Sequence, residues 1–128
     1  MNICCDEQTI GADPLSFRWN IVRGDTSSLD FQFLENDETT FIDLSEWSFI
    51  ATAYSVAADD SYVLIVSKNG GTVTVTAPKN ITSTWGIGYH SQVAELNFDL
   101  QGTHNNGTVW TPVIGMIKVL GDVTIGGL

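Results

Sequence analysis

Apolar and polar residues alternate with a period of two in several segments of this chain, and this pattern constrains the fold more than any other feature. In residues 17–23 it places Phe17, Trp19 and Ile21 on one face, because successive side chains of a strand point to opposite sides. The same alternation recurs in residues 28–34, 47–56, 72–77 and 92–101. Each segment therefore predicts a half-buried β-strand with its apolar face towards a core.

Two further segments complete the predicted set of strands. Residues 62–67 are apolar on both faces, which indicates a central strand or one covered by a partner. Residues 108–119 follow a hairpin loop and carry Pro112 near their start. A proline there fits a strand entrance or a sheet edge, because it donates no hydrogen bond to a ladder. Residues 79–91 are irregular, with room for one short helical turn.

The spacing of these segments predicts the fold class. There are about seven strands with turn residues every 8–12 positions, as is typical of sandwiches, and no helical periodicity. We therefore expect an all-β fold, an antiparallel two-sheet β-sandwich of immunoglobulin-like type. The 128 residues suit a single domain with one core. We assign residues 17–128 to the sandwich and residues 1–16, which lack alternation, to an extended N-terminal arm.

Charge restricts the partners of the chain. Five Lys and Arg residues face fifteen Asp and Glu residues, a formal net charge of −10. Nucleic acids and anionic membranes both attract clustered cations, so we expect neither as a partner. Twelve of the acids but only two of the bases fall in residues 1–64. Either acidic loops keep the protein soluble, or they form a negative face that meets a basic partner.

No arrangement of residues points to catalysis or to a cofactor. The two histidines, His90 and His104, lie in the irregular segment and in a predicted hairpin loop, and no nucleophile motif accompanies them. Asp37, Glu38 and Asp43, or Asp59 and Asp60, could bind Ca²⁺, but their spacing is not that of a calcium loop, and acidic surface loops are common. We expect no enzyme, no cofactor and no metal site.

The N-terminal arm contains an adjacent cysteine pair, Cys4 and Cys5. Such a pair can form a strained vicinal disulfide, bridge to another chain or remain as thiols. No second Cys/His cluster accompanies them, which argues against zinc. We interpret Ile3, Cys4, Cys5 and Ile10 as contacts of a docking arm that binds a neighbouring protein.

Three aromatic residues beside predicted loops, Trp85, Tyr89 and Trp110, are candidate contacts for a partner or a glycan. If they are exposed, their rings could stack on sugars. The alternative is that they plug the open end of a small sandwich, where aromatic rings bury large areas. Arg23-Gly24-Asp25 likewise has two interpretations, an integrin-type motif or a turn made by the glycine, and we favour the turn.

Several landmarks occur in a characteristic order along the chain. They are Arg23-Gly24-Asp25-Thr26, Phe31 and Phe33, Ile42-Asp43-Leu44-Ser45, Phe98-Asp99-Leu100-Gln101, Asn106-Gly107-Thr108, Gly115-Met116-Ile117-Lys118-Val119 and Asp122-Val123-Thr124. In this order they resemble the N-terminal module of baseplate upper proteins of tailed bacteriophages and its stand-alone relatives. The segment at residues 85–94 departs from that pattern, because it is longer and richer in aromatic residues than we expect for the family.

The resemblance implies a non-enzymatic building block of a tailed-phage virion, made in the cytoplasm of the bacterial host. It would be a tail, baseplate or neck accessory or a capsid decoration protein. Its partners would be other virion proteins, and it would act as a homo-oligomer or in many symmetric copies. The alternative function is a glycan- or receptor-binding β-sandwich module.

Overall fold

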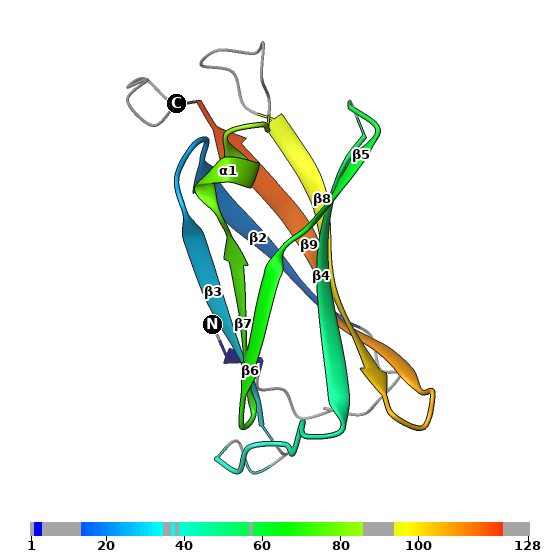
Figure 1. Ribbon diagram of the computed structural model, residues 1–128. Coiled ribbons are helices and arrows are strands. Elements are labelled where there is room, and N and C mark those ends of the chain that lie inside the picture. Colours follow the sequence, from blue (N-terminus) through cyan, green and yellow to red (C-terminus); the bar gives the residue numbers. More distant parts are fainter. Residues whose placement is uncertain are drawn as a thin grey trace.

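Two β-sheets that face each other form the fold in a computed structural model of the chain (Figure 1). The structure describes residues 2–3, 14–34, 37, 39–56, 58–85 and 94–121. Within these residues the elements are β1 (Asn2–Ile3), β2 (Leu15–Val22), β3 (Ser27–Phe33), β4 (Trp47–Ser55), β5 (Asp60–Val63), β6 (Ile65–Asn69), β7 (Thr72–Ala77), α1 (Lys79–Thr82), β8 (Ala94–His104) and β9 (Val109–Leu120). The larger sheet has the strand order β2-β9-β8-β4-β5, and the smaller one has the order β1-β3-β7-β6.

The predicted all-β sandwich of immunoglobulin-like type is therefore confirmed, and the alternating segments are its strands. Along β8 the side chains of Leu96, Phe98 and Leu100 are buried while those between them face outward. β7 ends at Ala77, directly before Pro78, and α1 is the short helical turn expected in the irregular segment. The pattern of burial follows the alternation because a strand exposes every second side chain to the opposite face.

The larger sheet is mixed, although the sequence pattern predicted antiparallel pairing. β2 runs parallel to β9, with Leu15 opposite Val113 and Val22 opposite Leu120. The two-residue β1 is likewise parallel to β3. Alternation specifies the face that a strand buries, but it does not specify the strand's direction, so the pattern alone could not reveal these pairings.

The strand predicted at residues 62–67 is part of a longer segment, residues 60–69, that divides between the two sheets (Figure 1). β5 forms an edge of the larger sheet and β6 an edge of the smaller one. Between them Leu64 is buried, and its N–H donates to the carbonyl oxygen of Ala51 at 2.9 Å. The prediction of a central strand is therefore wrong. Its alternative, a strand covered by a partner, stays a prediction.

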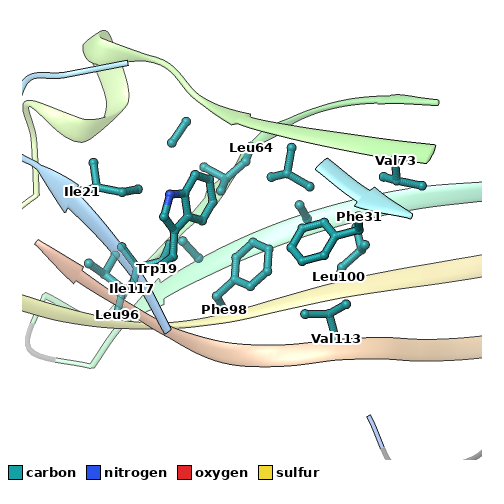
Figure 2. Packing of buried hydrophobic residues seen from close by; sticks show 14 of the residues in the cluster. Trp19, Ile21, Phe31, Leu64, Val73, Leu96, Phe98, Leu100, Val113 and Ile117 are labelled. Carbon is teal, nitrogen blue, oxygen red and sulfur yellow. The ribbon is translucent and has the colours of Figure 1, made fainter. Parts of the chain in front are cut away.

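The core lies between the sheets and is rich in aromatic rings (Figure 2). The ring of Phe98 meets Trp19 and Phe17 edge to face, with centroids 5.8 and 5.6 Å apart. Leu64 of the crossing segment reaches the same layer (Figure 2). The ring of Phe17 also meets Phe31 of the smaller sheet edge to face, with the centroids 5.4 Å apart. Edge-to-face pairs add about 0.5–1.5 kcal/mol beyond the area they bury, so this last contact helps to hold the two sheets together.

Pro112 lies in a central strand instead of at a sheet edge, because β9 is bulged at this point. The register between β8 and β9 shifts between Leu100 and Gly102. Pairing of β9 with β2 begins only at Val113. A proline in such a bulge removes no ladder hydrogen bond.

Candidate interaction surface

The segment 60–69 presents a free edge that belongs to both sheets. Within the described residues β5 pairs only with β4, and β6 pairs only with β7. The opposite side of each strand therefore carries backbone N–H and C=O groups with no ladder partner in this part of the chain. Such groups are a template for pairing with another chain.

Between Asp60 and Lys68, apolar side chains line the middle of this edge, where charged side chains usually give protection. Val63 is 66% exposed, and Ile65 and Ile50 are each 56% exposed. Thr52 lies opposite Val63 in the β4–β5 ladder, and Ile50 lies two residues from Thr52 on the same face of β4. We call Ile50, Val63 and Ile65 the apolar rim. A concentration of exposed β-branched residues beside an open edge is typical of an interaction surface.

Acidic residues flank one end of the apolar rim. Asp59 and Asp60 stand where the chain enters β5 and are exposed. The hydroxyl of Tyr54 donates to Asp59 Oδ1 at 2.7 Å, and this bond to a carboxylate raises the pKa of Tyr54. The end of the rim is thus negatively charged, in keeping with the acidic first half of the chain.

Other acidic residues considered as calcium ligands serve their own loops. Asp37 accepts hydrogen bonds from the Thr40 side chain and from the backbone N–H groups of Thr40 and Thr39, which lower its pKa to about 2. Asp43 accepts a 3.0 Å hydrogen bond from the N–H of Ser45, and its pKa is also lowered. Across the described part of the chain, no three or more His, Cys, Asp or Glu side chains gather as a metal site would require.

The two tryptophans proposed as partner or glycan contacts are buried. Trp85 is 2% exposed and packs edge to face on Tyr62, while Trp110 is 6% exposed and packs on Phe33 and Trp47. Neither ring offers a face to a sugar, so their assignment as contacts is corrected, and their burial fits the alternative of plugging the sandwich. Tyr89 lies outside the described residues.

The proposed docking arm is described only in part. Asn2 and Ile3 form β1, which pairs with Gln32 and Phe33 of the smaller sheet. At these two residues the backbone therefore adds to the domain's own sheet instead of extending from it, and the sandwich proper begins with β2 at Leu15. Cys4, Cys5 and Ile10 lie outside the described residues.

The Arg23-Gly24-Asp25 motif is a turn, as the favoured interpretation predicted. Gly24 has a φ of 90°, a conformation that glycine adopts without strain. The N–H of Asp25 donates to the carbonyl oxygen of Val22 at 3.0 Å. The carbonyl oxygen of Asp25 in turn accepts a 2.7 Å hydrogen bond from the hydroxyl of Thr82 in α1. The motif thus fastens the β2–β3 loop to the helical turn.

His104 anchors the β8–β9 hairpin. Its Nδ1 accepts a hydrogen bond from the N–H of Asn106 at 3.1 Å, and its Nε2 lies 3.4 Å from a carboxylate oxygen of Glu46. The ring also packs edge to face on Trp47. Both ring nitrogens are therefore engaged in holding the hairpin against the residues that precede β4. His90 lies outside the described residues.

A groove on the outer face of the larger sheet was missed by the sequence analysis. It is open to solvent, encloses about 650 Å³, and crosses β2, β9, β8 and β4. Arg18, Asn97 and Asp99 are among its lining residues. Burial raises the pKa of Asp99. The alternation in the sequence does identify the outward-facing residues of each strand. Which of these residues become neighbours depends on the strand order, which the alternation does not reveal.

No helix in the part of the chain that the structure describes has the length and apolar character needed to cross a bilayer.

No protein-family model matches the sequence, and no curated protein is similar to it. Among solved structures, the bradyzoite-specific antigen BSR4 from Toxoplasma gondii matches at 9% identity and a TM-score of 0.41, over 91% of this chain and 46% of that one. A 2,6-sialyltransferase from Photobacterium sp. JT-ISH-224 matches at 12% identity and a TM-score of 0.36, over 90% of this chain and 19% of that one. This chain thus spans less than half the length of either protein, and neither match bears on what it does.

Proposed function

We propose that this chain is a non-enzymatic interaction module of a tailed-phage particle, which docks on neighbouring virion proteins through the free edge at residues 60–69. The observation that carries the docking role is the apolar rim, where Val63 and Ile65 are 66% and 56% exposed on an edge shared by both sheets. The assignment to a phage particle rests on the ordered landmarks of the sequence.

The partner at this edge is an extended segment of another protein with apolar and basic side chains. An added strand would pair with the open N–H and C=O groups of β5 and β6, while its apolar side chains cover the rim. Its basic residues would lie near Asp59 and Asp60, and they would complement the net charge of −10. Symmetric particles repeat such a contact many times, so each copy needs only a modest interface.

Two lysine substitutions at the rim test this proposal. Val63→Lys and Ile65→Lys place a charge on the open edge, which opposes strand addition. Val109→Lys is the matched control, because Val109 is also 56% exposed but lies at the start of β9. All three sites are exposed, so the melting temperature should change little. The measurement is the amount of each variant in purified particles, determined by quantitative mass spectrometry.

We expect the two rim variants to fall at least about tenfold in particle content, equivalent to about 1.4 kcal/mol of docking free energy. The Val109→Lys variant should be incorporated like the unmodified chain. Equal incorporation of all variants would refute the edge as the docking surface. Recovery of the unmodified chain exclusively outside particles would refute the virion role itself.

A further inference from the structure

We propose that the outer face of the larger sheet carries a carbohydrate-binding groove, in which Arg18, Asn97 and Asp99 hydrogen-bond the hydroxyl groups of a glycan chain. This inference does not depend on the docking role proposed above, because the groove lies on the face of the sheet and the docking surface lies at its edge.

The strand register aligns the lining residues in two neighbouring rows. The first row crosses four strands in the order Arg18 of β2, Met116 of β9, Asn97 of β8 and Tyr54 of β4. The second row contains Ile114, Asp99 and Thr52. Neighbouring strands lie about 4.8 Å apart, so each row forms a line of side chains across the sheet. The groove is therefore elongated across the strands, as an extended oligosaccharide requires.

The polar groups in this groove have no protein partners. Arg18, Asn97 and Asp99 make no side-chain hydrogen bond or ion pair within the described residues. The Asp99 carboxylate is nevertheless partly buried, and the resulting loss of hydration raises its pKa. A partly desolvated carboxylate without a partner costs free energy, and a ligand hydroxyl that donates to it would offset this cost.

The outer face of the smaller sheet offers an internal comparison. There the polar side chains satisfy one another: Thr74 donates to Asp30 Oδ1 at 2.6 Å, and the hydroxyl groups of Ser28 and Thr76 are 2.8 Å apart. Both faces are rich in polar residues at the same kind of outward positions. The groove differs because its donors and acceptors are left open.

The chemistry of the groove favours a neutral polyol. It offers a cationic donor in Arg18, an anionic acceptor in Asp99 and both functions in Asn97, so an ion of either sign would meet one like charge. Ile114, which is 41% exposed, and Met116 supply apolar surface between these groups, against which the C–H faces of a sugar ring can pack. A peptide strand cannot add here, because the β8 and β9 backbones pair with neighbours on both sides.

Saturation-transfer-difference NMR tests this groove. The unmodified chain would be mixed in turn with maltohexaose, cellohexaose, chitohexaose, xylohexaose and oligosaccharides released from bacterial surface polysaccharides. We compare Asp99→Ala and Asn97→Ala with Asp30→Ala, which removes an outward carboxylate from the opposite face. Loss of a hydrogen bond to a charged group should weaken binding about tenfold or more for Asp99→Ala.

We expect saturation transfer for at least one sugar, with weaker binding in both groove variants and unchanged binding in Asp30→Ala and in Ile65→Lys, whose residue pairs in the smaller sheet. Absence of transfer from every sugar would overturn the proposal, as would equal binding by Asp99→Ala and the unmodified chain. Without sugar binding, a change in oligomeric state or in particle incorporation on Asp99→Ala would identify the groove as a protein contact instead. Binding lost only in Ile65→Lys would place the sugar at the apolar rim.

Discussion

Gly115 lies directly opposite Phe17 in the parallel β2–β9 ladder, so closely that a Cβ atom at residue 115 would collide with the carbonyl oxygen of Phe17. On its other side Gly115 lies opposite Phe98, and the rings of Phe17 and Phe98 meet edge to face at 5.6 Å. The missing side chain thus allows β2 to join the sheet and lets two core aromatics meet.

Gly115→Ala is expected to destabilise the fold, because the collision is with backbone that cannot rotate away. Overpacking of this kind costs about 1–3 kcal/mol, and the loss should appear in urea denaturation as a lower midpoint. Gly70→Asn serves as the control, since Gly70 has a φ of 61° and nothing within 4 Å of a Cβ, a conformation that Asn tolerates. A Gly115→Ala variant as stable as the Gly70→Asn variant would contradict the parallel pairing of β2.

Replacing two buried tryptophans by phenylalanine should have unequal effects. Trp19 Nε1 donates to the hydroxyl of Ser27 at 3.0 Å, whereas the buried Nε1 of Trp85 has no hydrogen-bond partner within the described chain. Trp19→Phe loses this bond, while Trp85→Phe removes an unsatisfied donor. We expect the free energy of unfolding to be about 1 kcal/mol lower for Trp19→Phe than for Trp85→Phe. If Trp85→Phe proved less stable than Trp19→Phe in thermal or urea denaturation, Trp85 would have an essential partner.

Lys68 joins the smaller sheet to the loop before β4. Its ammonium group donates to the carbonyl oxygens of Leu44 at 2.9 Å and Trp47 at 2.6 Å. Lys68→Met keeps the aliphatic chain and removes these donors, so we expect a loss of about 1.5–3 kcal/mol, as for hydrogen bonds from charged groups. Lys79 of α1 is the control, because its ammonium group makes no hydrogen bond within the described residues, and Lys79→Met should change stability by less than about 0.5 kcal/mol. Equal urea midpoints for the two variants would contradict the linking role of Lys68.

Asp99 should make the stability of the fold depend on pH in a defined direction. Burial raises its pKa above the ordinary value of 3.8, so the folded state binds a proton more tightly than the unfolded chain. Stability therefore falls as the pH rises from 3.8 through the folded pKa. Asp99→Asn should be more stable than the unmodified chain above this window and equal to it below.

The comparison is made by thermal denaturation between pH 3 and 8, with Asp30→Asn as the control. That variant weakens a bond from Thr74 and should show no gain at neutral pH. If Asp99→Asn lost stability at neutral pH, the carboxylate would have a stabilising partner, and the description of the groove as unpartnered would fail.

The strands and the faces they bury could be predicted from the sequence because both follow from local periodicity. Phe31 and Phe33, for example, are fully buried at the positions that alternation assigned to the core. The direction of β2 and the division of residues 60–69 between two sheets could not be predicted, because both depend on contacts distant in the chain. A run that is apolar on both faces fits a central strand as well as one that changes sheets at Leu64.

The candidate sites were less predictable than the fold. Trp85 and Trp110 stand beside loops in the sequence, but only the packing of Tyr62 and Phe33 against them reveals that both are buried. The groove around Asp99 combines residues from four strands. Local sequence patterns cannot predict which residues of these strands become neighbours, because that depends on the strand order.

Amide hydrogen–deuterium exchange of residues 60–69, compared between the isolated chain and the chain in purified particles, tests the docking surface most directly. The proposed function predicts that amides of β5 and β6 exchange more slowly in particles, because an added strand accepts their hydrogen bonds, while amides of the central strand β9 exchange alike in both states. The same exchange of residues 60–69 in particles and in the isolated chain would contradict the proposal.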